Sequence, residues 1–107
     1  MTTVSMETYY DTNMIIVSGH SGFAESGADI VCSAVSVLCY TLDAFLARCL
    51  DEGRISSYKK DFSEGYVIMD YTLRCPEDTG VTDGVEAITE GFRLLSESYP
   101  EYVTFDM

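Results

Sequence analysis

Hydrophobic and polar positions alternate near the beginning of the chain, which is the pattern of a half-buried strand. Residues 3–10 alternate in this way, and 14–18 contain the short apolar run Met14-Ile15-Ile16-Val17. Between them, Asp11-Thr12-Asn13 supplies residues that favour turns. The first eighteen residues therefore predict a β-hairpin.

The middle of the chain repeats this arrangement. Residues 54–62 and 66–74 are rich in β-branched and aromatic residues and flank Ser63-Glu64-Gly65, so a second hairpin is expected there. Cys75-Pro76 ends it. Tyr102, Val103 and Phe105 predict a short last strand.

Two segments instead have apolar residues three and four positions apart, which is helical spacing. The first is expected from Asp29 to about Glu52, ends at Gly53, and places on one face Val31, Val35, Leu38, Leu42, Phe45, Leu46 and Cys49. The second is expected to begin at a capping box formed by Asp83 and Glu86 and to end at Pro100. Its apolar face holds Val85, Ile88, Phe92, Leu95 and Tyr99.

The expected order is strand, strand, helix, strand, strand, helix, strand. Strands that arrive in hairpins favour an α+β fold with a mostly antiparallel sheet and two helices. With 107 residues and 47% hydrophobic content, the chain is long enough for one core and too short for two. A single domain over residues 1–107 is expected.

The charge balance limits the classes of partner. The chain has 18 acidic and 6 basic residues and a formal charge of −12, which opposes binding to phosphate backbones, so no direct nucleic-acid partner is expected. An acidic surface attracts basic proteins, although excess charge also simply maintains solubility.

Composition also suggests where the protein works. Met1–Val4 show no basic region followed by a hydrophobic one, and no uninterrupted apolar run approaches the ~20 residues of a membrane-spanning helix. We therefore expect a soluble, unexported, cytoplasmic protein without a membrane partner. Zinc sites favour Cys-x-x-Cys pairs or additional histidines, and the sequence has neither, so no metal is expected.

The candidate catalytic residues lie between the second expected strand and the start of the first expected helix. Asp29 is the expected N-cap of that helix, which places Cys32 in its first turn, where the partial positive charge of the helix favours thiolate over thiol. The only histidine, His20, lies twelve residues before Cys32, and its imidazole is suited to accept a thiol proton and to protonate a leaving amine. Gly19 would let a substrate backbone approach closely.

Every one of these residues also has a structural interpretation. A free cysteine is usually a small buried hydrophobe, a lone histidine is usually a loop residue, and an aspartate in this place most simply caps the helix. Ser36, one turn beyond Cys32, either bonds the backbone or lines the site, the former being more usual inside a helix.

The remaining cysteines, Cys39, Cys49 and Cys75, are expected to be structural. A redox pair between Cys32 and Cys39 is disfavoured, because two helical turns separate them by roughly 10 Å. A non-catalytic α+β module that binds a basic protein remains the alternative to an enzyme.

Two sequence elements resemble the ribosomal-processing cysteine protease family of bacteria. They are Gly19-His20-Ser21 and the run Gly27-Ala28-Asp29-Ile30-Val31-Cys32-Ser33-Ala34-Val35-Ser36. The match covers the ordered elements Gly-His, Gly-x-Asp-x-x-Cys and, after these, small residue-x-Ser. It departs at Ser21, where alanine commonly follows the histidine, and at Ser33, where another small residue is usual.

The resemblance implies a homodimeric cytoplasmic cysteine endopeptidase that needs no cofactor. It would remove the N-terminal extension of a large-subunit ribosomal protein by cleaving within a short hydrophobic motif that contains phenylalanine. Cys32 would be the nucleophile and His20 the base, with Gly19, Asp29 and Ser36 as supporting or substrate-binding residues. A mobile loop over residues 21–28 would gate the site.

Overall fold

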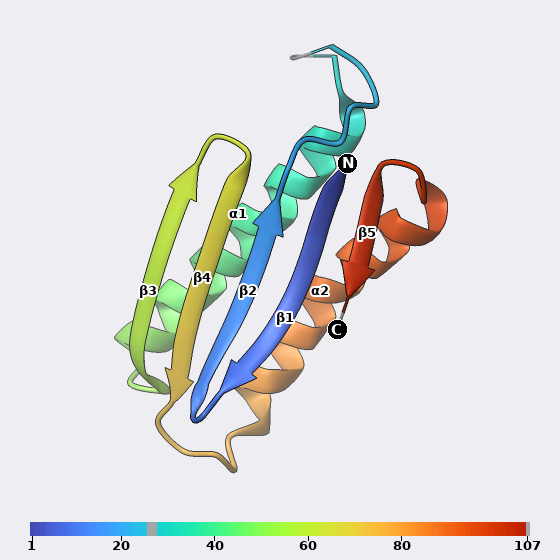
Figure 1. The fold of residues 1–107 in the computed structure, drawn as a ribbon. Helices are drawn as coiled ribbons and strands as arrows, with labels where there is room; N and C mark the ends of the chain where they lie inside the picture. Colours follow the sequence, from blue (N-terminus) through green and yellow to red (C-terminus); the bar gives the residue numbers. More distant parts are fainter. Residues whose placement is uncertain (26–27, 107) are drawn as a thin grey trace.

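The computed structural model describes residues 1–25 and 28–106, and its elements follow the expected order (Figure 1). They are β1 (Thr2–Tyr9), β2 (Thr12–Ser18), α1 (Ile30–Asp51), β3 (Ile55–Ser63), β4 (Tyr66–Leu73), α2 (Thr79–Ser98) and β5 (Val103–Asp106). Within the described residues, the five strands form one sheet in the order β3-β4-β2-β1-β5. Neighbours are antiparallel except β1 and β5, which are parallel. The expected α+β fold with a mostly antiparallel sheet is confirmed.

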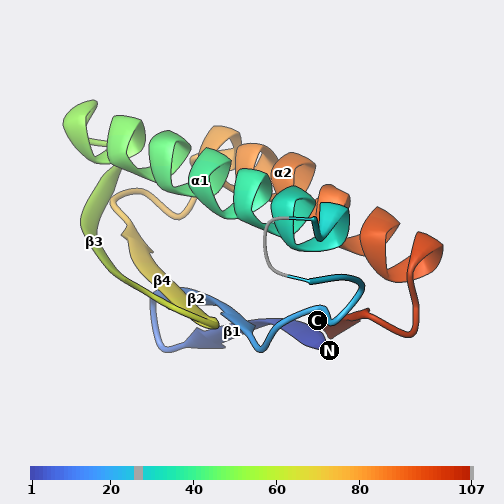
Figure 2. The same ribbon diagram turned by 90° about the horizontal axis from the view of Figure 1, so that it is seen from above.

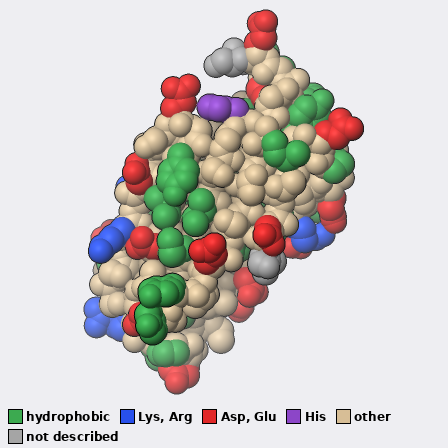
Figure 3. All heavy atoms as spheres, in the orientation of Figure 1, with side chains coloured by type: hydrophobic (Ala, Val, Ile, Leu, Met, Phe, Trp, Pro, Cys, Tyr) green, Lys and Arg blue, Asp and Glu red, His purple; other side chains and the backbone are tan. Residues whose placement is uncertain are grey.

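Both helices cover the same face of the sheet, so the core is a single layer between helices and strands (Figure 2). The predicted apolar face of α1 points into it: Val31, Val35, Leu42, Leu46 and Cys49 are buried, and Leu38 and Phe45 are partly buried. Val4, Ile15 and Met69 meet them from the sheet, and Phe92 from α2. The opposite face of the sheet carries no helix from the described part of the chain, and Figure 3 shows hydrophobic side chains among acidic ones on it.

The first hairpin turns more tightly than expected. Tyr10 and Asp11 alone form the turn, and Tyr10 takes a left-handed φ of 55°. Thr12 and Asn13 belong to β2 instead, because Asn13 pairs with Thr8 across the ladder and accepts a hydrogen bond from its hydroxyl at 3.1 Å. The turn expected over Asp11, Thr12 and Asn13 was therefore placed too late.

The end of α1 is where the sequence predicts it. Gly53 follows the helix with a left-handed φ of 72°, and its N–H donates to the carbonyl of Leu50 at 3.0 Å. The N–H of Arg54 donates to the carbonyl of Cys49 at 2.9 Å. These two bonds are the paired pattern of a Schellman motif, which satisfies the last carbonyls of the helix.

The start of α2 differs from the prediction. The capping box at Asp83 and Glu86 was the wrong start: α2 begins at Thr79 with Asp78 as its N-cap, and both capping-box residues lie exposed within the helix. Asp78 also binds the guanidinium of Arg54 through two hydrogen bonds of 2.6 and 2.9 Å. This long-range ion pair selects the earlier cap, and local sequence carries no sign of it.

One described helix bears on the expectation about membrane-spanning segments. Ile30–Asp51 is long and apolar enough, by length and composition, to cross a membrane. Serine, threonine and cysteine interrupt its apolar residues, which is why no continuous run stands out in the sequence. In the fold, this helix packs one face against the sheet and α2, as the core helix of a domain does.

Candidate active site

Cys32 lies in the first turn of α1, as predicted. Asp29 precedes the helix in an extended conformation, and its Oδ1 accepts a hydrogen bond from the N–H of Cys32 at 2.8 Å. This is the standard bond of an aspartate N-cap. The Cys32 thiol is free and half-buried, so it is accessible at the positive end of the helix.

The second oxygen of Asp29 anchors the loop that follows His20. Oδ2 accepts the Ser21 hydroxyl at 2.5 Å and the backbone N–H groups of Phe23 and Ala24 at 3.1 and 3.4 Å. Ser21 and Asp29 are only 2% and 7% exposed. Among the described residues, the partners of this carboxylate are these groups and the N–H of Cys32, and not the imidazole of His20.

These contacts change the acidity of Asp29. Burial of the carboxyl opposes ionisation, but the hydrogen bond from Ser21 and those from three backbone N–H groups outweigh it and hold the pKa of Asp29 below its usual value. An ionised carboxylate therefore joins the loop after His20 to the helical turn that carries Cys32.

His20 is held from the other side by the turn between β3 and β4. The β2–β4 ladder ends at the pair Ser18 and Tyr66, and the N–H of Gly19 continues it by donating to the carbonyl of Gly65 at 2.8 Å. Gly19 has a φ of 91°, which turns the chain out of the strand. The imidazole of His20 then lies against Gly65 and is exposed at the surface (Figure 3).

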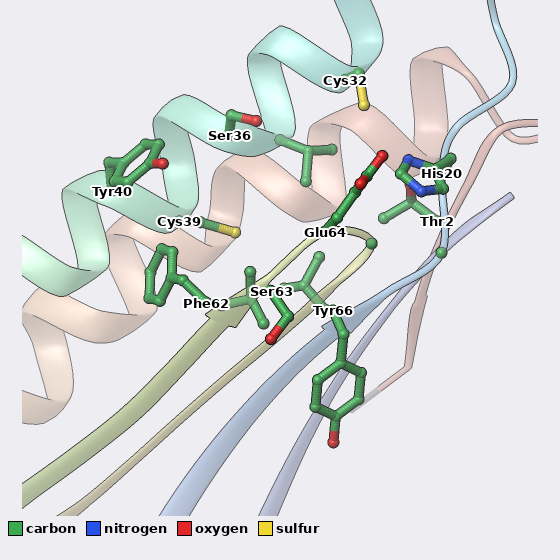
Figure 4. Close-up of a pocket in the computed structure, with 15 residues that line it drawn as sticks. Thr2, His20, Cys32, Ser36, Cys39, Tyr40, Phe62, Ser63, Glu64 and Tyr66 are labelled. Carbon is green, nitrogen blue, oxygen red and sulfur yellow. The ribbon is translucent and has the colours of Figure 1, made fainter. Parts of the chain in front are cut away.

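His20 and Cys32 line the same cleft, which has a volume of about 410 Å³ and lies between α1 and the β3–β4 hairpin. In Figure 4, the sulfur of Cys32 points from α1 into this cleft, and the imidazole lies across from it. Glu64 points toward both from the hairpin turn (Figure 4). A thiol and an imidazole thus line one open cleft.

The far end of the cleft is apolar. Tyr40 of α1 and Phe62 of β3 stack with ring centroids 5.5 Å apart, and Val35, Cys39 and Val67 also line this part. Burial raises the pKa of the Cys39 thiol to about 11, so this thiol stays protonated at neutral pH. This end of the cleft is suited to bind an apolar side chain and does not supply a second nucleophile.

The supporting residues predicted from the sequence take different positions. Ser36 is exposed and lines the cleft, which is the less usual of its two expected placements. The backbone bond is made instead by Ser33, whose hydroxyl donates to the carbonyl of Asp29 at 3.1 Å. Gly27 and part of the expected gating loop over residues 21–28 lie outside the described residues.

The other cysteines are partly as expected. Cys39 and Cys49 are buried, whereas Cys75, expected to pack in the same way, is exposed. It lies in the loop between β4 and α2, and its thiol donates to Glu77 at 3.0 Å. No group of three or more potential metal ligands forms among the residues that the structure describes.

Sequence reasoning missed the part of the site that comes from the second hairpin. Glu64, Gly65 and Tyr66 line the cleft, although they follow Cys32 by more than thirty residues. Their turn was predicted, but its place beside His20 depends on β4 pairing with β2, which local patterns do not reveal. The hydroxyl of Ser21 was likewise noted only as a departure from alanine.

Comparisons with known proteins find relatives in sequence and in fold. A family model described as cysteine protease Prp matches residues 1–104. The ribosomal processing cysteine protease Prp of Mycoplasma genitalium is 26% identical over 98 residues, which cover 88% of this chain and 87% of that protein.

Solved structures share the fold. The crystal structure of an essential ribosomal processing protease Prp from S. aureus, with a covalently linked product peptide, matches with a TM-score of 0.75 and 17% identity over 99% of this chain and 98% of that one. The crystal structure of SMU.848 from Streptococcus mutans matches with a TM-score of 0.69 and 30% identity over 99% of this chain and 92% of that one.

Proposed function

This chain belongs to the cysteine protease Prp family, and we propose that it is an endopeptidase that removes the N-terminal extension of a large-subunit ribosomal protein. The observation that carries the proposal is that His20 and Cys32 line one cleft, on two segments joined by Asp29. The name of the Mycoplasma relative, a ribosomal processing cysteine protease, supports the class of substrate.

The proposed reaction proceeds through a thioester. His20 removes the proton of the Cys32 thiol, and Sγ attacks the carbonyl carbon of the scissile peptide bond. The C–N bond breaks as the imidazolium returns that proton to the departing amine. Water, activated by the neutral imidazole, then hydrolyses the thioester and releases the acyl portion as a carboxylic acid with a free Cys32.

The positive end of the helix dipole lies at the start of α1, beside Cys32, where it would stabilise negative charge that develops during the reaction. Two of its N–H groups are not available to hold the developing oxyanion, because those of Cys32 and Ser33 already donate to Asp29. Ser36 faces the cleft one turn further along α1, where its hydroxyl can bond a substrate carbonyl.

The lining of the cleft supports an extended hydrophobic peptide as the substrate. Its apolar end, with Tyr40 and Phe62, suits an aromatic or aliphatic side chain of the substrate. The net charge of −12 favours encounter with a basic protein, which is the usual character of ribosomal proteins.

The proposal is tested by incubating the protein with the extended ribosomal protein of its host. Wild type should shorten that substrate, and Cys32→Ala and His20→Ala should leave it intact. Cys75→Ala is the matched control, because it removes an exposed thiol outside the cleft and should cleave like wild type. An intact substrate with wild type would overturn the proposal and favour a non-catalytic binding module.

We also propose that the protein is a cytoplasmic homodimer. Exposed Ile30 and Val37, at 60% and 63% exposure, lie with Ala44 along a solvent-facing stripe of α1 that a second copy would cover. Light scattering should report a dimer that Val37→Asp weakens.

The proposed cytoplasmic location has its own test. Fractionation of cells should recover the protein in the soluble fraction, and recovery with the membranes would contradict a cytoplasmic location.

A further inference from the structure

The β3–β4 turn approaches the imidazole of His20 at Gly65, a residue that has no side chain. A Cβ built on Gly65 would lie 2.8 Å from His20 Nε2 and 3.4 Å from both Cδ2 and Cε1 of the ring. Contacts under 3.0 Å are closer than carbon and nitrogen atoms approach without a bond, so a larger residue would displace one of the two groups.

The imidazole is the group that would move. Gly65 is fixed because its carbonyl accepts the N–H of Gly19 at 2.8 Å and its neighbour Tyr66 pairs with Ser18 in the β2–β4 ladder. His20 is exposed at the rim of the cleft, so its ring is free to rotate away. Substitution at Gly65 would therefore change the position of the base and leave the sheet intact.

We propose that Gly65 is a positioning residue for catalysis: its bare Cα forms the surface on which the His20 imidazole rests when it faces Cys32. This rests on the proposed function, since it assigns the turn a role in orienting the proposed base. A base displaced by about 1 Å can cost as much as 100-fold in rate, although the residue that moved it makes no contact with the reacting atoms.

A second glycine provides a matched control. Gly53 has a φ of 72°, against 73° for Gly65, and a Cβ built on Gly53 meets no heavy atom within 4 Å. Gly53→Ala and Gly65→Ala therefore carry the same left-handed backbone penalty. They differ because only Gly65→Ala places a methyl group against the His20 imidazole.

The kinetic experiment compares these two variants on a peptide that carries the ribosomal-protein extension. Gly65→Ala should lower kcat at least about tenfold with little change in KM, while Gly53→Ala keeps the wild-type kcat. Because Gly65 also lines the cleft, a raised KM with unchanged kcat would overturn the proposal and make it a substrate-contacting residue.

A second measurement needs no peptidase activity. His20 is the only histidine, so the ring Cε1–H signal in an NMR spectrum belongs to it alone. Gly65→Ala should shift this signal and Gly53→Ala should not. Equal spectra for the two variants would overturn the proposal, whereas a selective shift in a protein that cleaves nothing would uphold the contact and refute only the proposed function.

Two further variants guard against a failure to fold. Gly65→Asn and Gly53→Asn keep a residue that tolerates the left-handed conformation, and the same difference in kcat and in the His20 signal is expected between them. In a His20→Ala background, Gly65→Ala should leave the alkylation rate of Cys32 unchanged. A further fall in that rate would show that Gly65 acts without His20 and would contradict the proposal.

Discussion

Both helices have an aspartate as their N-cap, but the two aspartates bind different parts of the structure. Asp78 at the start of α2 binds the guanidinium of Arg54, which follows α1, and so joins the end of one helix to the start of the other. Asp29 at the start of α1 meets hydroxyl and backbone N–H donors from the loop after His20.

Asp78 therefore has a role in the stability of the fold, whereas Asp29 also has a role in the organisation of the site. Neither Arg54 nor Asp78 lines the cleft, so their ion pair can stabilise the fold without affecting catalysis. Asp29 caps its helix too, but its second oxygen determines where the chain leaves His20. One cap residue thus links the two proposed catalytic segments.

The largest effects are expected when the carboxylate of Asp29 or of Asp78 is removed. Asp29→Ala should lower kcat/KM about 100-fold, because both Cys32 and the loop beside His20 lose their shared partner. Asp78→Ala should lower the melting temperature by several degrees and leave kcat/KM within about twofold of wild type. Peptide cleavage and thermal unfolding measured on both variants check this, and equal activity losses would remove the distinction.

A smaller effect is expected at Ser21, which makes only one of the bonds to Asp29. Ser21→Ala should lower kcat/KM about tenfold, because the carboxylate keeps its backbone donors but loses its buried hydroxyl. Ser96→Ala is the control: its hydroxyl bonds the carbonyl of Arg93 on α2, away from the cleft. Wild-type rates for Ser21→Ala would show that the backbone bonds suffice.

The smallest effect concerns acid stability. The pKa of Asp29 is lowered in the folded protein, so its contribution to stability is full above the unfolded pKa, near 3.8, and is lost as the pH falls through the lower folded value. The stability difference between wild type and Asp29→Asn should therefore shrink below about pH 4. Urea unfolding at several pH values measures it, and a constant difference would contradict the assignment.

Much of the fold could be predicted because its signals are local. The alternation in β1 and the helical spacing of α1 report which faces are buried, and a glycine at position 53 predicts the end of the helix. The start of α2 could not be predicted in this way, because Asp78 is selected by Arg54 across the structure. Several nearby residues can serve as an N-cap by local sequence alone, and a long-range contact selects which of them does.

The site divides in the same way. Asp29 and Cys32 could be placed from the sequence, because an N-cap and the first helical turn are fixed by adjacent residues. The positions of Glu64 and Gly65 could not, because the strand order places them beside His20. The hydrogen bond between Ser21 and Asp29 is an intermediate case. The two residues are near in sequence, but they contact each other only when the loop folds back.

The insertion of β4 next to β2 has a consequence for the timing of biosynthesis. The residues proposed to react are translated early, at positions 20 and 32, but the strand that completes their cleft spans residues 66–73. A nascent chain would therefore display a histidine and a thiol well before it could organise them. Peptidase activity would therefore appear only late in translation, and incomplete nascent chains would not cleave other proteins.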